Sequence, residues 1–296
     1  MRGSIRYRWL LMLPIMLYVA ACSRAELVYE NADWLIYHWA TGLVDATSDQ
    51  RDAWRERFDV LLDEHRQRLL PEVVALVGVA EEEVKRGLSE QSLNCLFDRA
   101  DALYRDHAAL AIPIAVDILS EITPAQIDHL AEEFDERNTA YVEDYLAEDL
   151  EERTEARNER YLERVERWTG RLDDPQRQLI AGAVKKMPDT AEPWLEYRRA
   201  QQQQLLRLLR SRATPDQLRA FLTAWWVEIA QRPPTLVAHV REVRQRSIAV
   251  ALAVDASLRP EQREGIIERV ADIRSSLGNA LLVVSTPSPT TTQRCG

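Results

Sequence analysis

Hydrophobic residues recur along most of the chain with the three- and four-residue spacing of an α-helix. Polar residues separate them, and we find no convincing run that alternates between hydrophobic and polar positions as a half-buried strand does. Glycine is scarce, with 9 residues, and the 13 prolines fall mostly where a helical pattern begins. The pattern therefore predicts an all-α protein.

A short motif precedes many of the helical runs: a small or polar residue, often a proline, and then a glutamine. Its glutamines are Gln50, Gln91, Gln126, Gln176, Gln217 and Gln262. In most copies a Thr or Asp stands three positions before the glutamine, which predicts a capping box. The first side chain accepts a hydrogen bond from a free backbone N–H, and the glutamine bonds back to the first residue's own N–H. Arg259 cannot act as such a cap, and the copy at Ser89 is weaker.

The interval between successive glutamines is roughly the length of one helical hairpin, and a repeat of this length is typical of a solenoid. The copies share little beyond the cap, so we predict an irregular antiparallel bundle of about ten helices rather than a regular array. Thr123 is the clearest predicted helix start, because Pro124 suits the first helical position and Gln126 can close the box.

The beginning of the chain has the pattern of an export signal. Three arginines precede an apolar run that ends at Ala21, and this run is shorter than the about 20 residues of a membrane span. Val19-Ala20-Ala21-Cys22 resembles the bacterial lipobox. The resemblance implies cleavage between Ala21 and Cys22, and acylation of Cys22 with diacylglycerol and an N-acyl chain such as palmitate. A plain signal peptide with an incidental cysteine is the alternative.

These features divide the chain into a signal peptide (1–21), a tether (22–28), a helical domain (29–284) and a tail (285–296). The tail is rich in Ser, Thr and Pro, a composition typical of disorder. Ser23 follows the lipobox cysteine where an Asp would favour the inner membrane, so resemblance to lipoprotein sorting implies the outer membrane, with the domain facing the periplasm.

Charge and cysteine content restrict the partners. The net charge of −10 becomes about −13 (−10 − 3) when the signal peptide and its three arginines are removed. Such an excess of acid argues against a nucleic-acid partner and against electrostatic attraction to anionic lipid, so the acyl chains would supply the membrane attachment. Cys95 and Cys295 could pair in an oxidising periplasm, but nothing in the sequence brings them together, and we expect two unpaired thiols.

Two helical stretches have an ambiguous polarity. Trp34, Leu35, His38 and Trp39 share one face, which we expect to pack into the core with His38 as a core histidine; a position at the membrane interface is the alternative. Between residues 150 and 161 the apolar positions almost vanish. This predicts a solvated helix held by ion pairs four residues apart, with a partner-binding arm as the alternative.

The chain also resembles two groups of proteins. Several stretches look like the signature of a proteobacterial family of uncharacterised helical lipoproteins: Tyr29–Leu35, Glu136–Asn138, Glu163–Gly170, Pro188–Trp194 and Arg198-Arg199. The recurring Thr-Pro-x-Gln starts are similar, more weakly, to the LTxxQ motif of the periplasmic Spy/CpxP stress proteins. The first resemblance implies a class without a mechanism, and the second implies chaperone-like binding.

The chemistry that the sequence predicts is binding rather than catalysis. The five histidines lack metal-site spacing, and phosphate-binding loops and nucleophile elbows are absent, so we expect no metal, no cofactor and no enzymatic activity. We expect a helical binding or chaperone-like lipoprotein with an envelope protein as its partner, and a candidate surface at Asp33, Trp34, Asn138 and Trp194. The alternatives are an enzyme with a helical cleft near Asp33 and Trp34, and an envelope-organising protein.

Overall fold

The computed structural model describes residues 32–147, 149–228, 232–282 and 295. Their helices are α2 (Ala32–Leu43), α3 (Ser48–Glu64), α4 (Leu70–Arg86), α5 (Glu90–Glu121), α6 (Pro124–Tyr145), α7 (Leu150–Thr169), α8 (Asp174–Val184), α9 (Ala191–Arg210), α10 (Pro215–Leu222), α11 (Pro234–Ser257) and α12 (Pro260–Leu282), with the π-helical turns η2 (His65–Leu69) and η3 (Thr223–Val227). These ranges contain no strand. The prediction of an all-α helical bundle is confirmed.

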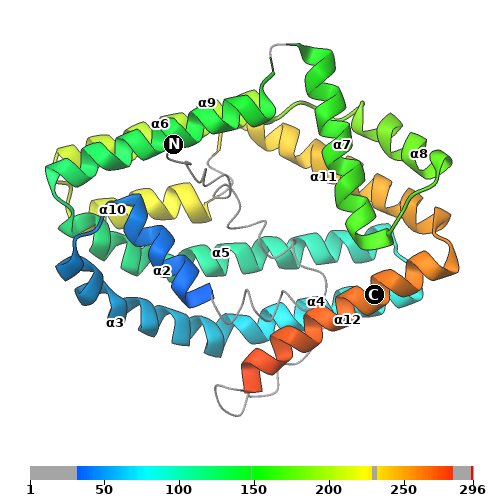
Figure 1. Cartoon of the computed structure of the whole chain (residues 1–296), viewed down its shortest axis with the longest axis horizontal. Coiled ribbons are helices and arrows are strands. Elements are labelled where there is room, and N and C mark those ends of the chain that lie inside the picture. The colour runs from blue at the N-terminus through cyan, green and yellow to red at the C-terminus, as the bar shows by residue number, and fades with distance from the viewer. Residues whose placement is uncertain (1–31, 148, 229–231, 283–294, 296) are drawn as a thin grey trace, which may run out of the picture.

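The helices form an irregular bundle around the long helix α5 (Figure 1). Helices α6 and α9 lie side by side along one edge, and the continuous rod α3–η2–α4 runs along the opposite edge. Helix α12 packs along α4, whereas α7 crosses one end of the molecule and contacts α8 and α12. The arrangement therefore closes that end with α7, α8 and α11.

The hydrophobic core is divided among these groups of helices. The largest cluster contains Trp54, Val116, Leu130 and Leu222, and it joins α2, α3, α5, α6, α9 and α10. A second cluster, with Ile180 at its centre, joins α7, α8 and α11, and a third lies between α4 and α12. Burial of these side chains, at about 25 cal/mol per Å² of apolar surface, is the main force that holds the helices together.

The predicted capping boxes are present. The side chains of Thr47, Thr123, Asp173 and Thr214 each accept a hydrogen bond from the backbone N–H of the glutamine three residues later, and the glutamine accepts one in return. At Ser89 the box is closed by Ser92 and not by Gln91. At Arg259 the backbone N–H donates to the Gln262 side chain at 3.1 Å, and the Arg259 side chain instead pairs with Asp173 at 2.9 Å.

Four of the glutamines also pair with each other, which the sequence pattern did not predict. The amides of Gln50 and Gln126 exchange two hydrogen bonds, of 3.1 and 2.7 Å. Those of Gln176 and Gln262 do the same at 3.0 and 3.3 Å. Gln126 donates in addition to the backbone carbonyl of Asp45. The motif therefore joins two helix starts that are distant in sequence, in addition to capping each helix.

The expectation of two unpaired thiols is wrong: Cys95 in α5 and Cys295, 200 positions apart in sequence, form a disulfide. Their Cα atoms are 5.7 Å apart, a usual separation for bridged cysteines. Cys295 is also buried, with 6% of its surface exposed. Folding thus brings the end of the chain to α5, a proximity that sequence spacing alone could not indicate.

We expect loss of this disulfide to lower the free energy of unfolding by about 2–5 kcal/mol, the usual range for a native disulfide. The bond closes a long loop, since its cysteines are 200 positions apart, and so it removes much of the chain entropy of the unfolded state. Urea unfolding of Cys295→Ser measures the difference. A reductant should lower the urea midpoint of unfolding of the native protein and leave that of the variant unchanged. Equal midpoints for the two proteins without reductant would contradict the prediction.

The aromatic face of α2 is divided: Trp39 is half-buried, with the Arg137 guanidinium 5.9 Å from its ring, whereas the other three residues point outward and not into the core as expected. Trp34 is 58% exposed and Leu35 39% exposed, and His38 is exposed as well. The buried face of the helix carries Tyr37 and Thr41 instead, and Val44, directly after the helix, is buried as well. The Tyr37 ring meets the Phe58 ring edge to face at 5.5 Å, and its hydroxyl donates to the backbone carbonyl of Arg51. These α3 contacts decide which of two apolar faces is buried.

Candidate functional site

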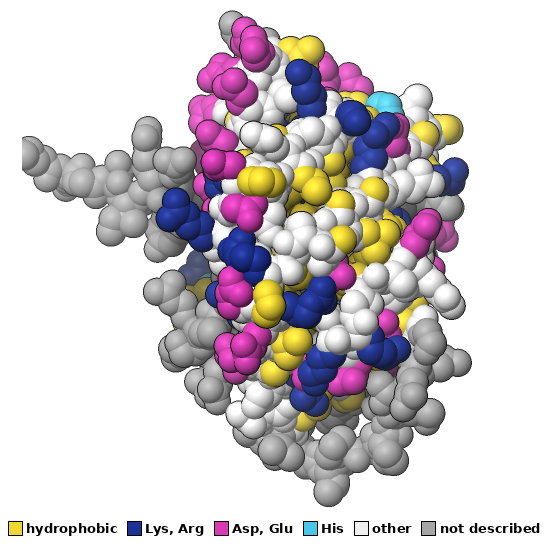
Figure 2. Space-filling view, turned by 90° about the vertical axis from the view of Figure 1, so that its right-hand side faces the viewer, with side chains coloured by type: hydrophobic (Ala, Val, Ile, Leu, Met, Phe, Trp, Pro, Cys, Tyr) yellow, Lys and Arg dark blue, Asp and Glu magenta, His cyan; other side chains and the backbone are white. Residues whose placement is uncertain are grey.

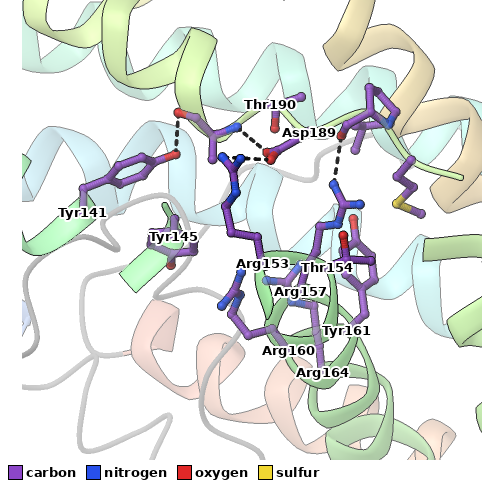
Figure 3. A pocket seen from close by; sticks show the side chains of 14 residues that line it. Tyr141, Tyr145, Arg153, Thr154, Arg157, Arg160, Tyr161, Arg164, Asp189 and Thr190 are labelled. Atoms are coloured by element: carbon purple, nitrogen blue, oxygen red, sulfur yellow. Dashed lines mark hydrogen bonds and ion pairs between the residues drawn. The ribbon is translucent and has the colours of Figure 1, made fainter. Parts of the chain in front are cut away.

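A pocket of about 200 Å³ lies beside α7. Figure 2 shows the end of the molecule to which α7 belongs, where basic, acidic and hydrophobic side chains are interspersed on the surface. Side chains from the end of α6, one face of α7 and the segment between α8 and α9 surround the pocket (Figure 3). They are Tyr141, Tyr145, Arg153, Thr154, Arg157, Arg160, Tyr161, Arg164, Met187, Pro188, Asp189, Thr190, Ala191 and Val243. Arginine and tyrosine thus dominate the lining.

The four arginines occupy one face of α7, because the spacing of Arg153, Arg157, Arg160 and Arg164 by four, three and four residues returns to the same side of a helix. The glutamates between them are exposed. The prediction of ion pairs along this helix is wrong: in the described residues the ion pairs of α7 join it to Asp189 and Arg177 outside the helix. The segment is therefore basic toward the pocket and acidic toward solvent.

Two of the arginines hold neighbouring helix ends. Arg157 donates to the backbone carbonyls of Pro188 at 3.3 Å and Val184 at 3.5 Å. Arg160 donates to the carbonyl of Asp144, near the end of α6, and lies 4.8 Å from the Tyr145 ring. The last carbonyls of a helix have no partner within it and carry a partial negative charge. These contacts position α7 against α6 and α8.

The remaining groups leave hydrogen-bond donors available. Asp189, 3.7 Å from Arg153, is the one carboxylate in the lining, so four arginines and one acid give the pocket a formal charge of +3 (4 − 1). Arg164 lies exposed at 5.5 Å from the Tyr161 ring, and it has no carboxylate or hydrogen-bond partner among the described residues. The Nε atoms of Arg153 and Arg157 are buried without a partner. The site is suited to an anion with several acceptor oxygens.

Tyr141 forms the wall of the pocket toward α9. Burial, followed by the proximity of Tyr145, raises the pKa of Tyr141 to about 12, so its hydroxyl stays protonated at neutral pH. That hydroxyl donates to the carbonyl of Ala191 at 3.3 Å. On its other side the Arg198 guanidinium lies 5.6 Å from the ring, and burial lowers the pKa of Arg198. The cationic region therefore continues behind this wall.

The residues predicted as a binding surface are not gathered at one site in the described structure. Trp34 lies on the outer face of α2, and the side chain of Asp33 is outside the description, as are Ala21 and Cys22. Asn138 is buried in α6, where its amide donates to the Gln202 side chain at 2.8 Å. Trp194 lies in α9 beneath the Arg232 guanidinium, 5.1 Å away. None of Trp34, Asn138 and Trp194 lines the pocket.

The sequence nevertheless contained two signals for the pocket. The row of arginines on α7 could have been recognised from its helical spacing. In addition, Arg164 and the run Pro188–Thr190 belong to the stretches that carry the resemblance to helical lipoproteins, and both line the pocket. Asn138 and Trp194 are each one helical turn from a lining residue, Tyr141 and Ala191.

The described residues contain no cluster of three or more side chains that could hold a metal ion. Among them, too, no helix is both long and apolar enough to cross a bilayer.

Comparison with known proteins identifies a family but no activity. No curated protein and no solved structure matches the chain. One family model, described as a family of unknown function, matches residues 42–226, which is more than half of the 296 residues. The match includes every lining residue of the pocket except Val243. The chain therefore belongs to the family of unknown function DUF6279.

Proposed function

We propose that the protein is an envelope lipoprotein that binds a small oxygen-rich anion without catalysing a reaction. Acylated Cys22 holds it in the outer membrane, and the helical domain faces the periplasm. The lipobox pattern and the resemblance to helical lipoproteins support the anchor. The pocket beside α7, with a formal charge of +3 in a chain of net charge −10, supports the binding role.

The surplus of arginine is the observation that carries this proposal. Arg157 and Arg160 have a structural role, because they donate hydrogen bonds to backbone carbonyls near the ends of α8 and α6. The charge of Arg153 is balanced by its ion pair with Asp189. Arg164 has no such structural role in the described residues. The three uncompensated positive charges of the lining repel one another. A bound anion would relieve that repulsion and accept hydrogen bonds from Arg164 and the nearby tyrosine hydroxyls.

The size of the pocket indicates the class of ligand. Pockets for drug-sized molecules usually measure about 300–1,000 Å³, and this one measures about 200 Å³. It suits a small organic phosphate or carboxylate, for which arginine is the preferred partner, more than an unfolded protein segment. The tyrosine rings offer a flat apolar surface for the body of such a molecule.

We expect Arg164→Ala to weaken binding about tenfold or more, because a hydrogen bond from a charged donor contributes about 1.5–3 kcal/mol. Isothermal titration of the purified chain with inorganic phosphate, glycerol 3-phosphate and citrate measures the effect. Arg164→Lys should retain part of the affinity, since the charge remains.

Arg167→Ala provides the matched control. Arg167 is an exposed arginine one turn further along α7 that does not line the pocket, so its loss should leave the affinity unchanged. The proposal would be abandoned if none of the three anions bound saturably, or if the variants at 164 and 167 weakened binding equally.

A further inference from the structure

We propose that the outer face of α2, formed by Trp34, Leu35 and His38, lies in the headgroup region of the membrane that holds Cys22. This inference rests on the lipid anchor of the proposed function, and it adds a second contact between the protein and the bilayer. It assigns the orientation of the helical domain: α2 faces the membrane.

The first argument is the exposure of this face. Trp34 is 58% exposed and Leu35 39% exposed, although both are large apolar side chains. Among the described aromatic rings, the Trp34 ring pairs edge to face with that of His38, which is exposed as well, with centroids 4.2 Å apart and planes at 86°. The neighbouring side of the same helix is already buried through Tyr37 and Thr41. Helix α2 is therefore apolar on two sides, and the core covers one of them.

The second argument is the distance to the anchor. Helix α2 begins at Ala32, ten positions after Cys22 (32 − 22), and ten residues extend at most about 36 Å. Trp34 lies in the first turn of that helix. A bilayer is consequently the one large apolar surface that acylation would keep within reach of this face.

The third argument concerns the force that would hold the domain there. With a net charge near −13 after cleavage (−10 − 3), the domain gains nothing from attraction to anionic lipid. Contact with the headgroup region must then come from apolar and amphipathic side chains. Tryptophan is enriched at that depth because its ring is apolar and its N–H can bond to water or headgroups.

A nitroxide label measures this contact in the full, lipidated chain. In Trp34→Cys, Cys95 and Cys295 are paired and Cys22 is acylated, so the introduced thiol is the one that reacts. The protein is placed in vesicles of phosphatidylethanolamine and phosphatidylglycerol. The accessibility of the label to oxygen, relative to a water-soluble nickel complex, should be about threefold or more higher at 34 than at a control position.

Leu150→Cys is the matched control, because Leu150 is 63% exposed and the start of α7 is well separated from α2 (Figure 1). Equal ratios at 34 and 150 would overturn the proposal. Spin–spin broadening between labels on different molecules would also overturn it, by showing that a second copy covers the face. Mass spectrometry of the same sample tests the anchor separately, because an unmodified Cys22 refutes the anchor. If, in addition, the oxygen-to-nickel accessibility ratio at position 34 does not change when vesicles are added, the membrane contact is refuted as well.

Discussion

Gln126→Ala is expected to lower the free energy of unfolding by about 3 kcal/mol, whereas Gln217→Ala should cost less than about 1 kcal/mol. Both glutamines close a capping box with the same geometry. Gln126, however, is buried, and its side chain also donates to the carbonyl of Asp45 and exchanges two hydrogen bonds with Gln50. Its removal breaks all of these partly buried hydrogen bonds, while Gln217 is exposed and its partner N–H can bond to water.

Urea unfolding of the two variants tests this contrast, with Gln50→Ala and the Gln50→Ala/Gln126→Ala pair completing a double-mutant cycle. The coupling free energy between the two glutamines should be about 1 kcal/mol or more, because each single change leaves the other side-chain amide without its hydrogen-bond partner. Equal losses at 126 and 217 would show that the cap alone, and not the pairing of helix starts, supplies the stability.

The free energy of unfolding should fall by up to about 3 kcal/mol as the pH is lowered from 6.5 to about 4. Burial, then the proximity of His107 and of Arg66, lowers the pKa of His65 from 6.5 to about 4. In this window the unfolded chain binds a proton at His65 that the folded chain does not bind. Acid therefore favours unfolding, and the stability is fully present only above pH 6.5.

The geometry explains why His65 stays neutral. The Nδ1 atom of His107 lies 2.6 Å from the carbonyl of Leu103, so this nitrogen carries the hydrogen. The Nε2 atom of His107 then accepts, and the Nε2–H of His65 donates to it across 3.2 Å. A charge on the buried His65 ring would be poorly solvated.

His65→Gln keeps a donor and removes the titration, so the variant should show a flatter pH dependence between 6.5 and 4.5. His38→Gln, at an exposed position, should keep the native profile. Below that window carboxylates take over; one is Glu81, whose pKa the hydrogen bond from Lys85 holds below its usual value. A profile that His65→Gln leaves unchanged would refute the assignment.

Much of the fold was predictable because helix starts are encoded locally. A threonine or aspartate three residues before a glutamine specifies a cap by itself, and four such starts, including Thr123, were identified from the sequence alone. The side of α2 that enters the core was not predictable, because both of its faces carry apolar residues and contacts from α3 decide between them.

The pocket and the disulfide depend on tertiary contacts. A helix rich in Glu and Arg is equally compatible with ion pairs along its own surface and with an arginine face turned inward. In α7 the arginine face turns inward, because Arg160 and Arg157 donate hydrogen bonds to backbone carbonyls near the ends of α6 and α8. Cys95 and Cys295 are 200 residues apart, and their meeting depends on where the end of the chain lies.

The π turn η2 has a consequence for the rod that α3 and α4 form together. A π turn contains about one residue more than an α turn, and each residue corresponds to about 100° of rotation around the helix axis. The turn from His65 to Leu69 therefore rotates α4 relative to α3. This offset brings Leu70 and Val73 of α4 back to the side of the rod that carries Trp54 and Phe58 of α3, so that one side of an unbroken rod packs against both the large cluster and α12. In a regular helix with the same number of residues, the two pairs of side chains would no longer share a side.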